Sequence, residues 1–118
     1  MKKVNILGTE YTIEIVEPDE EMQKNDWVGL CVGYDKIIKL VNFSKMDSFK
    51  NSSETEIINA MKETLRHEII HAFFNESGLK DSANVYDGPW CKNEELVDWL
   101  AIQGPKIIQA WKEAGCID

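Results

Sequence analysis

The sequence predicts an α+β fold: a small antiparallel β-sheet of three or four strands, followed by helices, in one domain spanning residues 1–118. Two patterns indicate this fold. Apolar and polar residues alternate in the first third of the chain, whereas from residue 53 apolar residues recur at the spacing of an amphipathic helix. A chain of 118 residues is long enough to bury one core without disulfides and too short for a second folded domain.

The predicted sheet consists of two hairpins, with strands at residues 4–7, 11–16, 27–32 and 37–41. The second strand alternates most clearly, because Tyr11, Ile13 and Ile15 are separated by polar residues. Gly8-Thr9 connects the first pair of strands, and the glycine and aspartate of residues 33–36 suit a tight turn between the second pair.

Three helices are predicted after the sheet: from Ser53 to Gly78, from Asn93 to about Gln103 and from Lys106 to about Ala114. Ser53 and Glu56 form a capping box at the start of the first helix, and Gly78 tolerates the positive φ of a helix C-cap. Gly104-Pro105 is expected to end the second helix and separate it from the third. Residues 42–52 and 79–92 are predicted loops.

Composition and charge restrict the class of protein. Apolar residues make up 43% and charged residues 29%, as in globular proteins, and no apolar run is long enough to span a bilayer. A net charge of -8 without a local basic patch argues against nucleic acid as a partner. Three cysteines without a CxxC pair indicate free thiols and a cytoplasmic location. The acidic residues 17–21 are predicted to form a solvated loop.

The central motif is His67-Glu68-Ile69-Ile70-His71 on the first predicted helix. Residues four apart lie one turn apart on the same helix face, so His67 and His71 can place ring nitrogens on one metal ion. Glu68 points about 100° away, where its carboxylate can act as general base toward a metal-bound water. Polar residues four apart also occur on solvated helix faces, so the motif alone leaves a metal-free interpretation open.

A catalytic zinc ion needs a third protein ligand and an open fourth position. The chain has two histidines, so the third ligand must be a carboxylate or Cys91. Glu94 and Asp98 are four apart on the second predicted helix: Glu94 is the expected ligand, and Asp98 is expected to hydrogen-bond a ligating imidazole. Glu95 and Cys91 are the alternative ligands.

These residues carry a resemblance to known families. His67-Glu68-x-x-His71 followed by Asn93-Glu94-x-x-x-Asp98 resembles the gluzincin arrangement, in which the glutamate of the second segment is the third zinc ligand. The resemblance implies Zn²⁺ as the cofactor, held by His67, His71 and Glu94, with Asn93 and Asp98 behind the ligands. The predicted fold is accordingly a minimal zincin-like one, with a zinc-binding helix and a carboxylate helix.

The order of sheet, zinc helix and carboxylate helix is also similar to the compact ImmA/IrrE-type metallopeptidases of bacteria, prophages and mobile elements. The resemblance covers residues 53–103. Two departures indicate a phage-type relative rather than a repressor-cleaving member: Ile70 stands where that family has glycine or alanine, and the Leu-Met-Pro sequence after its carboxylate helix is absent.

The predicted function is hydrolysis of peptide bonds in a peptide or protein substrate, with Glu68 as base. Tyr86 is the candidate for stabilising the oxyanion. Arg66 is expected to be a surface ion-pair partner of Glu63 or a neighbouring residue. Two alternatives remain open: a zincin-like binding or regulatory protein whose metal is structural or vestigial, and an α+β interaction protein without a metal. The sequence predicts neither an oligomeric state nor a particular substrate.

Overall fold

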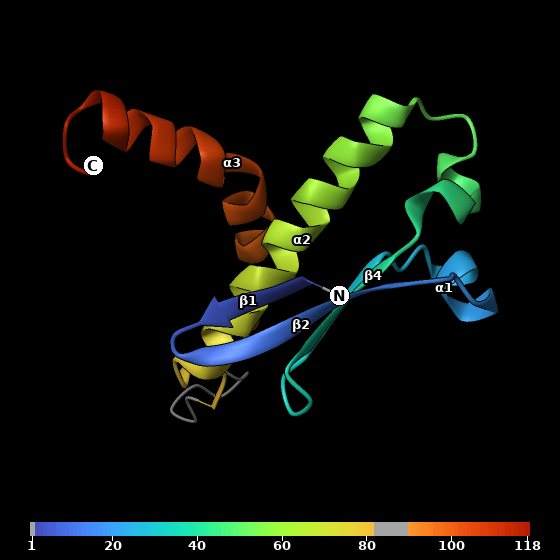
Figure 1. Cartoon of the computed structure of the whole chain (residues 1–118), viewed down its shortest axis with the longest axis horizontal. Helices are drawn as coiled ribbons and strands as arrows, with labels where there is room; N and C mark the ends of the chain where they lie inside the picture. Colours follow the sequence, from blue (N-terminus) through green and yellow to red (C-terminus); the bar gives the residue numbers. More distant parts are fainter. Residues whose placement is uncertain (1, 82–89) are drawn as a thin grey trace.

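The computed structural model describes residues 2–81 and 90–118, which form an α+β fold (Figure 1). The strands are β1 (Lys2–Ile6), β2 (Thr9–Val16), β3 (Gly29–Val32) and β4 (Ile37–Val41). The α-helices are α1 (Glu20–Asn25), α2 (Glu54–Glu76) and α3 (Glu94–Glu113). None of the helices in these two ranges is both long enough and apolar enough to cross a membrane.

The sheet is mixed, so the prediction of a purely antiparallel sheet is wrong. The strand order is β1-β2-β4-β3, and both predicted hairpins, β1 with β2 and β3 with β4, are antiparallel. However, β2 and β4 pair in parallel, with Ile13 beside Ile38 and Ile15 beside Leu40. The chain leaves β2, passes through α1 and enters β3 before it returns as β4. This crossover places β3 at one edge of the sheet.

The main core lies between one face of the sheet and α2, which crosses that face diagonally (Figure 1). The buried residues of this cluster are Ile6, Tyr11, Ile13, Ile38, Leu40 and Ala72. A second cluster, formed by Val41, Phe43 and Met46, contacts α1 through Met22 and the first half of α2 through Ile57 and Met61. The two clusters together hold α2 at both ends, and its central turns therefore lie at a fixed place over the sheet.

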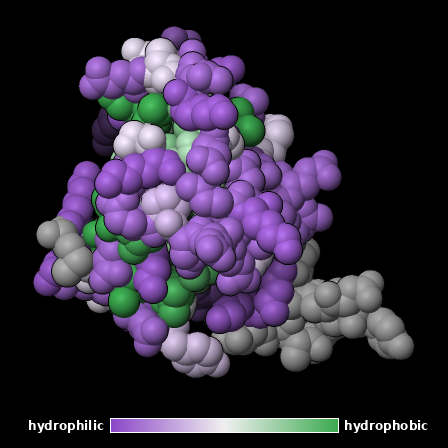
Figure 2. All heavy atoms as spheres, turned by 90° about the vertical axis from the view of Figure 1, so that its right-hand side faces the viewer, coloured by the Kyte–Doolittle hydropathy of each residue, from purple (hydrophilic) through white to green (hydrophobic). Residues whose placement is uncertain are grey.

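The surface agrees with the charged composition. Figure 2 shows one face of the molecule, where hydrophilic side chains predominate and hydrophobic ones form separate patches. The exposed hydrophobic residues include Leu30 in the edge strand β3, Trp27 just before it, and Trp99 and Trp111 on α3.

Helix α1 is an element that the sequence analysis missed. Residues 17–21 were predicted to form a solvated loop, but α1 begins at Glu20. The side chain of Asp19 caps it by accepting a hydrogen bond from the Met22 backbone N–H at 2.8 Å. Glu20 and Glu21 then lie in the first turn, where negative charge is favourable to the helix dipole.

Helix α2 has the predicted bounds to within two residues. Ser53 caps it by accepting a hydrogen bond from the Glu56 backbone N–H at 3.1 Å. The helix ends at Glu76, and Gly78 takes a φ of 84° just beyond it. These signals are local, which is why the sequence predicted them correctly.

Helix α3 contradicts the predicted break at Gly104-Pro105, because one helix runs from Glu94 to Glu113. Proline has no N–H, so the Ala101 carbonyl four residues earlier loses its normal helical donor. The Arg66 side chain of α2 replaces it, since Arg66 Nε donates to the Ala101 oxygen at 2.5 Å. Arg66 therefore joins α2 to α3 and is not a surface ion-pair partner of Glu63. Beyond this point α3 extends away from α2 (Figure 1).

A second link joins the end of α2 to the sheet. Glu76 Oε2 accepts hydrogen bonds from the Tyr11 hydroxyl at 2.7 Å and from Lys36 Nζ at 2.8 Å. The bond from Lys36, and then that from Tyr11, lower the pKa of Glu76 to about 2. Tyr11 itself is fully buried, and its pKa is raised, chiefly by this burial.

The contact between Arg66 and Ala101 gives a double-mutant test. Arg66→Met leaves the buried Ala101 carbonyl without a donor, and we expect a loss of about 1–3 kcal/mol in the free energy of unfolding. In a Pro105→Ala background the alanine amide can donate to the same carbonyl, so the loss should be smaller. Urea denaturation of the native chain, the two single variants and the double variant measures the cost of Arg66→Met in each background. Equal costs in the two backgrounds would contradict the view that Arg66 takes the place of the missing amide donor of Pro105.

The Glu76 network predicts a pH dependence. The pKa of Glu76 is lowered from 4.5 to about 2 in the folded chain, so its ionised form stabilises the fold at neutral pH. That contribution is lost as the pH falls through the interval from 4.5 to about 2. We expect Glu76→Gln to be less stable than the native chain at neutral pH, with the difference shrinking across this interval. Denaturation curves of both chains between neutral pH and pH 2 test this, and a pH-independent difference would count against it.

Candidate metal centre

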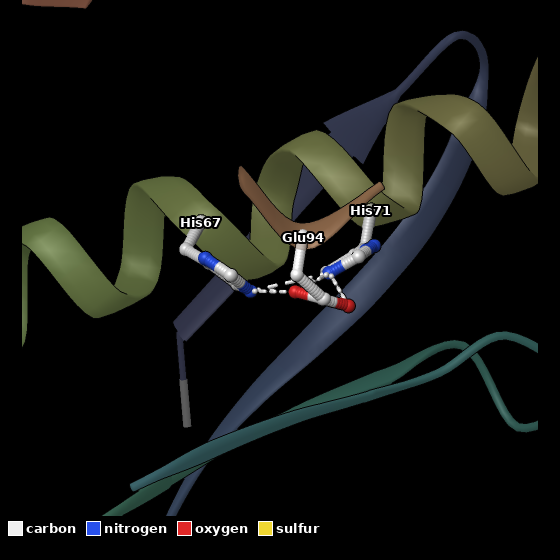
Figure 3. Close-up of side chains that lie close together, drawn as sticks. All are labelled: His67, His71 and Glu94. Atoms are coloured by element: carbon white, nitrogen blue, oxygen red, sulfur yellow. Dashed lines mark hydrogen bonds and ion pairs between the residues drawn. The ribbon is translucent and has the colours of Figure 1, made fainter. Parts of the chain in front are cut away.

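Helix α2 supplies two of the site's side chains. His67 and His71 lie one turn apart on the same face, and their Nε2 atoms are 3.2 Å apart (Figure 3). The two nitrogens therefore converge on one point. Both side chains are only partly buried, so solvent still reaches them. The motif spacing predicted this convergence.

The first residue of α3 supplies the third side chain. Glu94 Oε2 lies 3.1 Å from His67 Nε2, and Glu94 Oε1 lies 3.2 Å from His71 Nε2. The preceding residue, Asn93, caps α3 by accepting a hydrogen bond from the Leu96 backbone N–H at 2.9 Å. This cap fixes where the helix begins and therefore where Glu94 projects.

The spacing of these donor atoms fits a zinc ion. Tetrahedral coordination with bonds of about 2.1 Å places any two ligand atoms about 3.4 Å apart, close to the separations observed here. Two imidazole nitrogens and one carboxylate oxygen are also a donor set that zinc prefers, and they leave one coordination position open. His67, His71 and Glu94, called the metal group below, have ligand atoms that all lie within 4.8 Å of one another.

Asp98 supports this group from one turn further along α3. Its Oδ1 lies 2.7 Å from His67 Nδ1. When His67 Nδ1–H donates to this carboxylate, the Nε2 lone pair is left free to face the other two ligands. Asp98 was predicted to orient a ligating imidazole, and the structure brings it to His67.

Glu68 lies beside the group without joining it. Its Oε1 is 3.7 Å from His67 Nε2, and its side chain is 8% exposed. Burial raises the pKa of Glu68 to about 7, while His67 lowers it and Glu94 raises it. Glu68 also lines the cavity that opens over the group, where it can act as a general base toward a bound water.

A cavity of about 600 Å³ opens over the group, and His67, Glu68, His71 and Glu94 line it together with the edge strand β3. Gly29 of this strand passes close above α2. A Cβ atom at this position would lie 2.7 Å from Thr64 Cγ2 and 3.3 Å from Glu68 Oε1. Sequence reasoning missed Gly29, although a glycine inside a predicted strand is a known sign of close backbone approach.

The structure also bears on the alternative site residues. Among the described residues, Glu94 is the carboxylate that meets both imidazoles, whereas Glu95 and Cys91 are outside the group. Cys91 is 2% exposed and belongs to the buried residues. Tyr86, the predicted oxyanion stabiliser, lies outside the described residues.

Comparison with known proteins gives no match: no family model fits the chain, and neither a curated protein nor a solved structure is recognisably similar to it. The resemblance to gluzincins and to ImmA/IrrE-type metallopeptidases therefore stays a prediction that rests on the motif residues.

The geometry predicts how metal binding depends on the acidic side chains. We expect the metal-free chain to take up about one Zn²⁺, and we expect Glu94→Gln and Asp98→Asn each to weaken the affinity by about 10- to 100-fold. Competition with a fluorescent zinc chelator measures these affinities. Glu95→Gln is the matched control, since it removes the neighbouring charge and should leave the affinity unchanged. Weakening by Glu95→Gln but not by Glu94→Gln would refute the assignment.

Proposed function

We propose that the protein is a zinc-dependent metallopeptidase. The observation that carries the proposal is the place of Glu68: a buried carboxylate that lines the cavity over a two-histidine, one-glutamate group. A purely structural zinc site needs four protein ligands and no neighbouring base. Three donors with an adjacent carboxylate are instead the arrangement of a hydrolytic site.

Each residue has a role in this proposal. A bound zinc ion would lower the pKa of its water toward 7 and polarise the scissile carbonyl. His67, His71 and Glu94 would hold the ion, and Asp98 would keep His67 in the tautomer that faces it. Glu68 would take the proton of the attacking water and deliver it to the leaving amine.

The edge strand supports a peptide as the substrate. β3 pairs with β4 along one side and is the last strand of the sheet, and its residues 29–31 line the cavity over the metal group. A strand at the edge of a sheet offers backbone N–H and C=O groups to an extended peptide. A peptide bound in this way would pass directly over Glu68, which Gly29 approaches.

The test separates turnover from metal binding. We expect Glu68→Gln to retain zinc but to lower kcat for a quenched fluorescent peptide by about 100-fold or more, because the base is lost. Glu95→Gln serves as the control for the loss of one carboxylate and should retain activity. Turnover by the zinc-loaded Glu68→Gln chain at the native rate would refute the role of Glu68.

A native chain that binds zinc and cleaves no peptide would instead favour the alternative, a zincin-like binding or regulatory protein. A chain that neither retains nor takes up zinc would exclude both the metallopeptidase and the zincin-like binding or regulatory protein.

A further inference from the structure

We propose that this site takes peptides carrying opposite charges on the two sides of the cleaved bond, with the acidic residue N-terminal and the basic residue C-terminal to it. The inference deepens the proposed peptidase function and rests on it. Its basis is a reversal of charge between two cavities that flank the metal group.

The two cavities meet at the metal group. The larger one, of about 600 Å³, follows β3 from Val28 past the metal group to Asn75, and the smaller one, of about 230 Å³, lies toward Thr64. Both are lined by His67, Glu68 and Gly29. A peptide that follows β3 across the metal group would therefore have one end near Asn75 in the larger cavity and the other end beside the smaller cavity.

The larger cavity is basic apart from the site itself. Lys39, Lys80 and Lys92 line it, and the carboxylates among its described lining residues are Glu68 and Glu94, which belong to the metal site. Among the side chains that the structure describes, no carboxylate forms an ion pair with these three lysines. Lys80 also lies over the Tyr34 ring, with its Nζ 5.3 Å from the ring centroid. In a chain with 13 basic and 21 acidic residues, three lysines outside the described ion pairs at one cavity favour a negatively charged ligand there.

The smaller cavity has the opposite charge. Asp26, Glu63 and Asp98 line it together with Glu68, and none of its described lining residues is a lysine or an arginine. Asp26 accepts a hydrogen bond from Ser48 and Asp98 contacts His67, but Glu63 is exposed. The charged side chains that line the site therefore change sign from one side of the metal group to the other, which favours ligand charges in a fixed order.

The direction of β3 sets that order. Gly29, at its start, lies against Thr64 and Glu68, whereas a Cβ atom at Gly33, just past its end, would lie 3.6 Å from Lys80 Nζ. β3 thus runs from the acidic side to the basic side. A peptide strand added antiparallel to β3, as β4 is on the other side, would have its N-terminal part beside Lys80. Its acidic residue would then precede the cleaved bond.

Quenched fluorescent peptides of one length test the proposal with the zinc-loaded full chain. One peptide carries the order acidic, scissile bond, basic; a second has the reverse order; a third is neutral at both positions. We expect the first to exceed the neutral peptide in kcat/KM by about fivefold or more, and added salt to reduce the difference. Equal values for the three peptides, or a preference for the reverse order, would overturn the proposal.

Charge-reversal variants assign the effect to the two cavities. Lys80→Glu should remove the preference for the acidic residue, and Glu63→Lys should remove that for the basic residue. Lys50→Glu is the matched control, because Lys50 is exposed and lines neither cavity. The same loss of preference in the control would show an effect of net charge alone and would contradict the proposal.

A binding measurement separates this proposal from the proposed function. The same peptides, labelled and without a quencher, are titrated with the zinc-loaded Glu68→Gln chain, and fluorescence anisotropy gives their affinities. If the native chain cleaves no peptide, the peptidase function fails, whereas tighter binding of the first peptide still supports the charge order. Equal affinities for all three peptides overturn the charge order, even where peptides are cleaved.

Discussion

The metal group depends on the register in which α3 crosses α2. Two consecutive residues of α2 set it: Arg66 donates to the Ala101 carbonyl, and His67 contacts Asp98. Because the two helices run in opposite directions at this crossing, a third contact follows one turn away, where Glu94 meets His71. Pro105 is part of the same arrangement, since its missing N–H leaves the Ala101 carbonyl available to Arg66. A shift of α3 by one residue would break all three contacts and separate the ligands.

The sheet acts on the site from the other side. Gly29 allows β3 to approach α2 closely enough to cover Glu68, and this cover removes water from the carboxylate and raises its pKa. A larger side chain at this position would have to displace Thr64 or Glu68. The same close approach brings the free edge of β3 beside the histidines. One glycine therefore links the chemistry proposed for Glu68 to the groove in which a peptide would lie.

The sequence predicted what one helix determines by itself. The Ser53 cap, the end of α2 near Gly78 and the shared face of His67 and His71 follow from local geometry. Asp98 could be placed because it lies one turn from Glu94. The wrong predictions depend on contacts between distant segments: β2 pairs in parallel with β4 only because β3 occupies the edge of the sheet. Likewise, α3 continues through Pro105 because of Arg66, which is 35 residues from Ala101 in the chain.

The distribution of charged side chains around the site also depends on contacts between distant segments and cannot be predicted from composition. The net charge of -8, without a local basic patch in the sequence, argued against nucleic acid as a partner. Folding, however, brings Lys39 from β4, Lys80 from the segment after α2 and Lys92 from the segment before α3 to one cavity. These residues are far apart in the sequence, so no local basic patch marks them. The cavity beyond Glu68 gathers carboxylates from three other segments in the same way. The proposed selectivity for a ligand's charge would thus arise from the helix crossing and the strand edge that also build the metal group, and substitutions that shift α3 would alter both together.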